Sequence, residues 1–246
     1  GSIKHHAQFL KAERGQFPNF EFVRALKKAL TANNGTIFRY HHHENTVLND
    51  IRAQILRDPA AVPDADELIA FIESITYRSE GKGNRVQGSR CMVDLCDMVE
   101  RYYFHRMMDG RTSIKKVLPA IIHDSGYLQA KYSSSTNELG ISSLALGNFI
   151  LIRREAGKLV DPYTMLPPVF SDMDIPEEIK VDDQISGGGG AMMAFARLQF
   201  SELSDTSREQ IKSALLRYCE LDTIAMVLIM DYWKNDLLKR SGNEAA

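Results

Sequence analysis

The sequence predicts an α/β domain, because strand-like and helix-like segments alternate over its first sixty residues. Residues 3–10 form a short, moderately β-prone segment, and residues 35–40 read GTIFRY, a β-branched and aromatic run typical of a buried strand. Apolar residues recur at helical spacing after each of them, in residues 17–35 and 44–58. Strand, helix, strand, helix is the order found in α/β domains, where helices cover a sheet.

The rest of the chain is predicted to be mainly helical around one irregular excursion. We expect a strand end that runs into a helix at residues 91–103, and two C-terminal helices that meet near Tyr218. Pro119 is expected to kink or end a helix over 113–125. Residues 130–190 lack a periodic pattern and are expected to be an insertion in a single domain that spans residues 1–246. Further helices are expected at 64–75 and 191–200, and the two helices that meet near Tyr218 are expected to span 204–238.

Composition and charge narrow the class of protein. The 246 residues are 44% hydrophobic and 25% charged, which is ordinary for a globular chain and excludes a disordered or fibrous one. A net charge of −2 excludes a strongly basic, histone-like binder of nucleic acid. The three cysteines, Cys91, Cys96 and Cys219, form no CxxC pair and no disulfide framework is expected.

The sequence shows no membrane-spanning or export segment. The longest apolar run, 224–230, is too short to span a bilayer, and the first ten residues resemble no signal peptide. A cytoplasmic protein without membrane contact is therefore expected.

Asp222 is the first candidate for chemistry. Apolar residues surround it on nearly every side of its predicted helix, and a carboxylate there is costly unless it is paired or binds a cation. Tyr218 lies four residues earlier, on the same helical face. A phenol and a carboxylate could thus contact one substrate or metal. The alternative is a Tyr–Asp hydrogen bond that only satisfies two core groups.

Glu44 is the second candidate. It follows the predicted strand 35–40 at the start of the next helix. A carboxylate at a helix N-terminus is stabilised by the helix dipole without any further role. However, ligands in α/β proteins gather at the ends of strands. Both interpretations remain open from position alone.

Together the two features resemble a known class of enzymes. Tyr-x-x-x-Asp on a C-terminal helix, with an acid after an upstream strand, is similar to the later motifs of DEDD 3′→5′ exonucleases of the tyrosine type. The fuller pattern, from about residue 3 to residue 233, resembles a bacterial family of uncharacterised proteins considered to have a ribonuclease H-like, DnaQ-type exonuclease domain. The segments that carry this resemblance are FPNFEFVRAL, GTIFRYHHHENTVLNDI, SIKKVLPAII, DPYTMLPPVF and RYCELDTIAMV.

The resemblance implies a mixed sheet flanked by helices and a two-metal site that hydrolyses phosphodiesters of DNA or RNA. Glu44 and Asp222 would be ligands of Mg²⁺ or Mn²⁺, and Tyr218 would orient or help deprotonate the attacking water. In such sites one ion activates the water and the other stabilises the departing 3′ oxygen. Hard cations of this kind prefer oxygen ligands.

The first motif of these enzymes, Asp-x-Glu on an apolar strand, is missing from the sequence. Neither residues 64–67, at a helix start, nor residues 172–174, in a loop, replace it. We therefore expect either a fragment without its first strand or a chain that lost it, and an inactive or weakly active nuclease. The alternative is a degenerate exonuclease fold that serves as a nucleic-acid-binding or protein-interaction module. Other domains of a larger protein are possible partners, and an uncovered sheet edge would favour a homo-oligomer.

Four further groups are weaker candidates. Asp94 lies where a strand is expected to meet a helix, and it is expected to cap that helix. Adjacent histidines on an extended segment point in alternating directions, so of the three at 41–43 only His41 and His43 could share a zinc ion with Glu44. The glycine run 187–190 could bind a phosphate, but it lacks the Lys-Ser/Thr of a P-loop and is expected to be a hinge. Scattered bases that could contact phosphates are Lys115, Lys116, Arg153, Arg154, Arg197 and Arg217.

Overall fold

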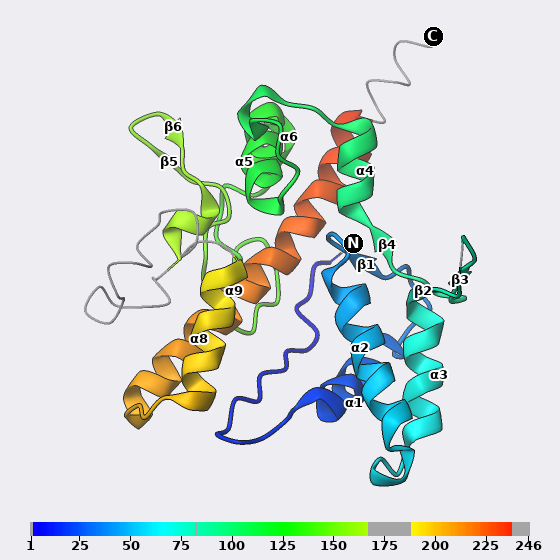
Figure 1. Ribbon diagram of the computed structural model, residues 1–246. Coiled ribbons are helices and arrows are strands. Elements are labelled where there is room, and N and C mark those ends of the chain that lie inside the picture. Colours follow the sequence, from blue (N-terminus) through cyan, green and yellow to red (C-terminus); the bar gives the residue numbers. More distant parts are fainter. Residues whose placement is uncertain (1, 82, 167–187, 238–246) are drawn as a thin grey trace. The chain divides into compact units, whose positions relative to one another are not determined.

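The computed structural model describes residues 2–81, 83–166 and 188–237, and it divides the chain into two compact units (Figure 1). Unit 1 contains residues 1–16 and 105–246, and unit 2 contains residues 17–104. Across the described residues the protein is mixed α/β, with most of its regular structure in helices and three two-stranded sheets. The predicted α/β class is confirmed at this level, whereas the single domain over 1–246 stays a prediction.

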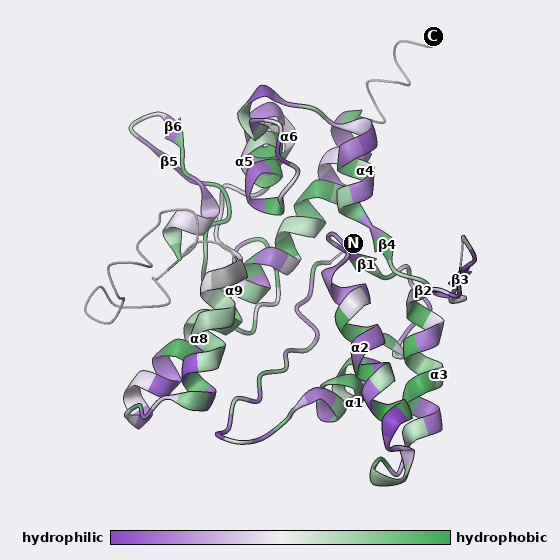
Figure 2. Ribbon diagram, in the orientation of Figure 1, coloured by the Kyte–Doolittle hydropathy of each residue, from purple (hydrophilic) through white to green (hydrophobic). Residues whose placement is uncertain are grey.

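Unit 2 is built around three helices, and its core lies between them. They are α1 (Asn19–Leu30), α2 (His43–Arg57) and α3 (Ala65–Ile75), with a short 3₁₀ helix at Pro59–Ala61. Buried aliphatic and aromatic side chains on their facing sides include Val23, Ile55 and Ile72. Figure 2 shows α3 mostly in the hydrophobic colour, which fits its position in this core. The helical periodicity read from the sequence for these three segments is confirmed.

Two small sheets complete unit 2. Strands β1 (Phe38–Arg39) and β4 (Val93–Asp94) are parallel, and β2 (Tyr77–Ser79) pairs antiparallel with β3 (Arg85–Gln87). Strand β4 leads directly into α4 (Leu95–Tyr102), as the sequence predicted. A parallel pair needs a long crossover, and here α2 and α3 provide it.

Unit 1 is organised around one long helix. Helix α9 (Asp205–Tyr232) continues into a π-helical turn at Trp233–Leu237, and α5 (Ile114–Asp124), α6 (Gly126–Lys131) and α8 (Gly188–Phe200) pack against it. A hairpin of β5 (Arg154–Glu155) and β6 (Lys158–Leu159) follows α6 in the chain. Among the described residues of this unit, 3₁₀ helices form at Arg106–Met108 and Pro162–Met165.

Three sequence-based predictions are wrong in unit 1. The two helices expected to meet near Tyr218 are one continuous helix, α9, because no glycine or proline interrupts 205–232. Of the kink or early end expected at Pro119, the early end is wrong, since α5 continues to Asp124 with the apolar residues on both sides of the proline buried. Residues 3–10 form no strand: Lys4 makes one isolated bridge to Ser142, and Leu10 instead packs on a core cluster of α8 and α9.

Of the predictions for the glycine run and for the irregular insertion, the structure contradicts the first and agrees with the second over the described residues. Gly188–Phe200 is helical, so the last three glycines of the run open α8 and do not form a hinge. Gly187 and the acidic residues 172–178 lie outside the described residues. Between 132 and 166 the described chain contains only the short hairpin and one 3₁₀ helix, which agrees with the expected irregular stretch.

Asp231 joins α9 to α6 within unit 1. Its carboxylate accepts hydrogen bonds from Lys131 Nζ and from Tyr132 Oη, each at 2.5 Å. Burial opposes ionisation of Asp231, but these two donors and the Lys131 charge outweigh it and lower its pKa. Tyr132 is only 1% exposed, so the loss of its acceptor would leave a buried hydroxyl unsatisfied.

We expect Asp231→Asn to destabilise unit 1 by about 1–3 kcal/mol at neutral pH. A lowered folded-state pKa stabilises the fold above the unfolded pKa of roughly 3.9, and this contribution is lost as the pH falls through the folded value. Urea unfolding followed by the fluorescence of Trp233, which lies two residues away and is the single tryptophan, measures the difference at pH 7 and pH 3. The exposed pair of Glu209 with Lys212 supplies a control, Glu209→Gln, which should change stability by less than about 0.5 kcal/mol. A difference between wild type and Asp231→Asn that is the same at both pH values would contradict this role.

None of the helices in the described part of the chain combines the length and apolar character that a membrane span requires.

Candidate functional site

Asp222 lies in a cluster of side chains from three segments of unit 1 that are far apart in the sequence. It is half-buried on α9, and Tyr163 Oη donates a hydrogen bond of 2.6 Å to its Oδ1. Tyr163 comes from the 3₁₀ helix Pro162–Met165 and is buried. Asp161 caps that short helix by accepting a hydrogen bond of 3.0 Å from the Tyr163 backbone N–H. The Asp-Pro-Tyr sequence thereby fixes the phenol that meets Asp222.

Lys115 brings a positive charge into this cluster from α5. Its Nζ lies 4.5 Å from the centroid of the Tyr218 ring and 5.1 Å from that of Tyr163. The two rings are themselves neighbours, with centroids 6.2 Å apart. Within the described residues, Lys115 Nζ is buried yet makes no hydrogen bond. The aromatic faces compensate part of the cost of burying the ammonium group, but its N–H donors are left for another acceptor.

The charges in the cluster are coupled. Burial lowers the pKa of Lys115, and the nearby carboxylates of Asp222 and Asp161 act in the opposite direction. Burial raises the pKa of Asp161, against the Tyr163 backbone N–H and the charges of Lys115 and Lys116. One cation thus lies within electrostatic range of two carboxylates in a poorly solvated region.

Both tyrosines are neutral phenols at physiological pH. Burial raises the pKa of Tyr163, and the charge of Asp222 and the hydrogen bond to it add to the effect. Burial and then the Asp222 charge also raise the pKa of Tyr218. Each hydroxyl can therefore donate a hydrogen bond, and neither is a base.

The structure brings together Tyr218 and Asp222, as their i, i+4 spacing predicted. A Tyr–Asp hydrogen bond was the alternative: a hydrogen bond to Asp222 is among the causes that raise the pKa of Tyr218, and Tyr163 donates a further one of 2.6 Å. Sequence reasoning did not single out Tyr163 or Asp161, and it treated Lys115 as one of several scattered bases. The available signal was the Asp-Pro-Tyr sequence, since Asp before Pro is a frequent start of a short helix.

Glu44 lies in the other unit. It is in the first turn of α2, as predicted, and is exposed as a whole residue. Packing around its carboxyl group raises its pKa, against its own backbone hydrogen bond and the charges of His43 and Arg39. Glu44 belongs to unit 2 and Asp222 to unit 1, so the expected meeting of the two acids stays a prediction.

Asp94 connects the parallel strand pair of unit 2 to the histidine segment. As predicted, it caps α4, accepting a hydrogen bond of 3.0 Å from the Cys96 N–H. Its carboxylate also accepts the His41 N–H at 2.8 Å and forms a buried ion pair of 2.9 Å with Arg39 Nη1. His41 has a positive φ of 69°, a conformation that this hydrogen bond holds in place. These contacts give Asp94 a structural role: it fixes the conformation of the backbone just before Glu44.

The His, Cys, Asp and Glu side chains of the described residues do not by themselves form a metal centre. Over residues 2–81, 83–166 and 188–237, no three His, Cys, Asp or Glu side chains are grouped so that they could hold an ion. The finding applies both to His41 and His43, where zinc was the alternative, and to the surroundings of Asp222. In unit 1 a cation, Lys115, lies near Asp222, and one Asp222 oxygen accepts the Tyr163 phenol. The described residues at Asp222 therefore do not fit a complete two-metal site.

Four of the other five candidate bases have local structural contacts that differ from those of Lys115. Lys116 Nζ lies 3.5 Å from Asp109, and Arg153 pairs with Glu155 at 2.5 Å. Arg154 donates to the Gly157 carbonyl at 2.9 Å, and Arg217 Nε donates to the Ala145 carbonyl at 3.2 Å. Lys115 differs from these four because its charged group is buried beside the aromatic rings and Asp222.

Comparison with known proteins gives one match. A family model described as "Domain of unknown function (DUF2779)" matches residues 1–113, which include all of unit 2 and Glu44. No curated protein and no solved structure matches the chain. Tyr218 and Asp222 lie outside the matched residues. Over its first 113 residues the chain is thus similar to a family whose function is unknown.

Proposed function

We propose that the chain is an exonuclease-like domain of ribonuclease H-like fold whose cluster at Asp222 contacts the phosphodiester backbone of DNA or RNA. The observation that carries the proposal is the position of Lys115. Its ammonium group is buried beside Tyr218 and Tyr163, and within the described part of the chain it has no hydrogen-bond acceptor. A phosphate oxygen is an acceptor of matching charge.

The roles of the side chains follow from this contact. Lys115 donates to a non-bridging phosphate oxygen, and the Tyr218 hydroxyl, which is hydrogen-bonded to Asp222, orients an attacking water through its oxygen. Tyr163 holds the carboxylate of Asp222 in place through its 2.6 Å hydrogen bond. Asp222 and Glu44 are the proposed ligands of Mg²⁺ or Mn²⁺, on the strength of the motif resemblance. Such ions would supply hydrolysis of the phosphodiester.

Weak or absent cleavage is part of the proposal, because the sequence lacks the Asp-x-Glu motif that would supply two more carboxylates. A second candidate function is a degenerate exonuclease fold that binds nucleic acid, or a protein partner, without cutting. The observation that favours it is the pairing of Asp222 with Tyr163 and the nearby Lys115, which stabilise the carboxylate without a metal.

One experiment separates the two functions. A single-stranded oligonucleotide labelled at its 5′ end is mixed with the protein in EDTA to measure binding, and in Mn²⁺ to follow shortening from the 3′ end. We expect binding in EDTA and little or no shortening in Mn²⁺. Strong Mn²⁺-dependent shortening would show that the missing carboxylates are not needed. An oligonucleotide that neither binds nor is cut would refute the proposed function.

Asp222→Asn and Glu44→Gln test the two acids directly. In a chain joined to a strand that carries Asp-x-Glu, each substitution should abolish Mn²⁺-dependent cleavage, because a neutral amide is a poor ligand for a hard cation. Asp205→Asn, an exposed acid in the first turn of α9, is the matched control and should leave the rate unchanged. Undiminished turnover of either test variant would exclude that residue from the site.

A further inference from the structure

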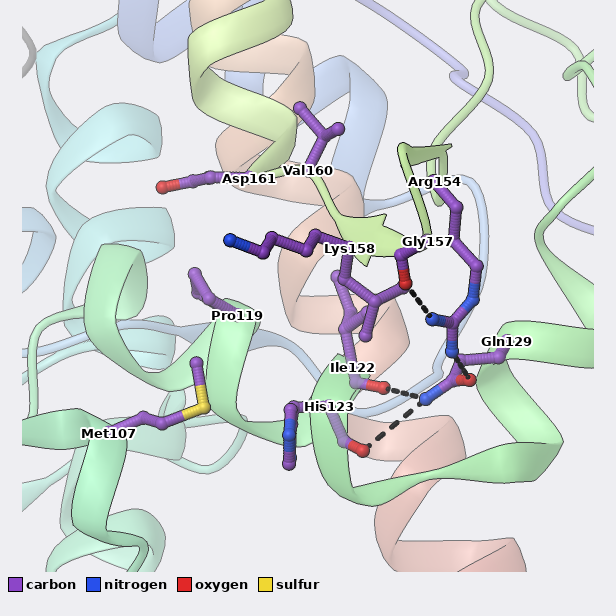
Figure 3. Close-up of a pocket in the computed structure, with 11 residues that line it drawn as sticks. Met107, Pro119, Ile122, His123, Gln129, Arg154, Gly157, Lys158, Val160 and Asp161 are labelled. Carbon is purple, nitrogen blue, oxygen red and sulfur yellow. Dashed lines mark hydrogen bonds between the residues drawn. The ribbon is translucent and has the colours of Figure 1, made fainter.

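Unit 1 contains a pocket of about 480 Å³ that shares Asp161 with the Asp222 cluster (Figure 3). Its walls come from α5, α6 and the β5–β6 hairpin, together with Asp161 and the preceding Val160. This volume lies in the range of pockets that hold small organic ligands.

One part of the pocket wall is apolar. Pro119 and Ile122 of α5, Leu159 of β6, and Met107 and Val160 contribute it. Apolar side chains of this kind pack favourably against the faces of a flat ring. The wall therefore suits a planar, weakly polar group.

The other part of the pocket is cationic. Arg154 is held rigidly: its guanidinium donates to the Gly157 carbonyl at 2.9 Å and to Gln129 Oε1 at 2.7 Å, and Gln129 in turn donates to the Ile122 carbonyl at 2.8 Å. Lys158 extends into the pocket, in Figure 3 toward the side where Asp161 and Pro119 lie. Among the described residues, Lys158 forms no ion pair. The Arg154 guanidinium lies on the other side in Figure 3, so the exposed ammonium group of Lys158 is the one available to a phosphate here.

From this combination we propose that the pocket binds a nucleoside monophosphate. The phosphate contacts Lys158, the base lies against the apolar wall, and Asp161 accepts hydrogen bonds from the sugar hydroxyl groups. The proposal of a planar anion rests on the pocket alone, whereas the choice of a nucleotide rests on the proposed function. Because Asp161 lies in both places, a nucleotide bound here would lie directly beside the Asp222 cluster.

The test is a calorimetric titration of the whole chain with AMP in EDTA, so that metal binding and cleavage play no part. Adenosine and ribose 5-phosphate are titrated in parallel, and each should bind at least tenfold more weakly than AMP. Lys158→Ala should weaken AMP binding by roughly tenfold. Lys212→Ala, which removes a surface lysine of α9 paired with Glu209, should leave it unchanged.

Several results would overturn the proposal: no AMP binding, equal binding of ribose 5-phosphate and AMP, or an AMP affinity that Lys158→Ala does not alter. Competition by an oligonucleotide would identify the end of a strand as the natural ligand, and its absence would identify a free nucleotide. Failure of the proposed function is separate: AMP would then bind while oligonucleotides do not.

Discussion

Lys115→Met is expected to weaken the binding of a single-stranded oligonucleotide by about 10- to 150-fold, the effect of losing one charge-assisted hydrogen bond worth about 1.5–3 kcal/mol. Methionine keeps the length and the apolar stem of the side chain between the rings of Tyr163 and Tyr218. It removes only the ammonium group, whose Nζ is buried without a hydrogen bond within the described residues. Fluorescence anisotropy in EDTA at one fixed salt concentration measures the change.

The same substitution should not destabilise the protein. A buried cation that lacks hydrogen-bond partners costs stability, and its replacement by an apolar group of similar shape is often neutral or stabilising. The thermal midpoint of Lys115→Met is therefore expected to equal or exceed that of the wild type. Lys212→Met is the matched control for binding. Unchanged oligonucleotide affinity, or a lower thermal midpoint, would indicate that Lys115 serves the fold and not a ligand.

Gly88→Ala is expected to destabilise unit 2 by about 3 kcal/mol or more, the upper range for overpacking. Gly88 lies where the chain crosses the end of α3, and its N–H donates to the Thr76 carbonyl at 2.9 Å. A Cβ at this position would lie 2.1 Å from the Glu73 carbonyl oxygen and 2.3 Å from that of Ser74. Both oxygens belong to the backbone of a packed helix, so relief requires α3 or the crossing segment to move.

Hydrogen exchange of the α3 amides measures this effect within unit 2. Exchange from residues 65–75 should be strongly accelerated in Gly88→Ala. Gly126→Ala is the matched control, because a Cβ at Gly126 meets nothing within 4 Å and the residue lies in a helix, where alanine is favoured. Wild-type protection of α3 in Gly88→Ala would show that the close approach is not a constraint on the fold.

Local periodicity predicted the helices of unit 2 well. The apolar positions of α1, α2 and α3 repeat at helical spacing, and these same positions form the core, for example Leu48, Ile51 and Ile55 of α2. The strand at 35–40 is shorter than expected, Phe38–Arg39, because pairing with β4 extends over only two residues. Register and strand length depend on a partner fifty residues away, which no local pattern encodes.

The errors in unit 1 have a similar origin. Residues 3–10 have moderate β-propensity, but a strand requires backbone pairing over several consecutive residues. Within this segment only Lys4 is paired, in an isolated bridge to Ser142. Pro119 does not end α5, because buried neighbours such as Val117 and Ile121 stabilise the helix on both sides of it.

Two of the four side chains of the candidate site, Tyr218 and Asp222, could be brought together from the sequence alone. The i, i+4 spacing of Tyr218 and Asp222 depends only on the helix and could be predicted. Lys115 and Tyr163 join them through the packing of α5 and a 3₁₀ helix onto α9, contacts that span more than fifty residues of sequence. Such convergence follows from tertiary packing, and residue type and spacing alone do not indicate it.

The proposed metal ligation requires Glu44 and Asp222 to serve one cation site, and a double-mutant cycle on Mn²⁺ binding tests this proposal most directly. Electron paramagnetic resonance of free Mn²⁺ gives the affinity of the wild type, Glu44→Gln, Asp222→Asn and the double variant. We expect weak binding to the wild type, weaker binding to each single variant, and a coupling energy of at least about 0.5 kcal/mol between the two positions. Strictly additive effects, or an affinity that does not respond to Glu44→Gln, would contradict the account.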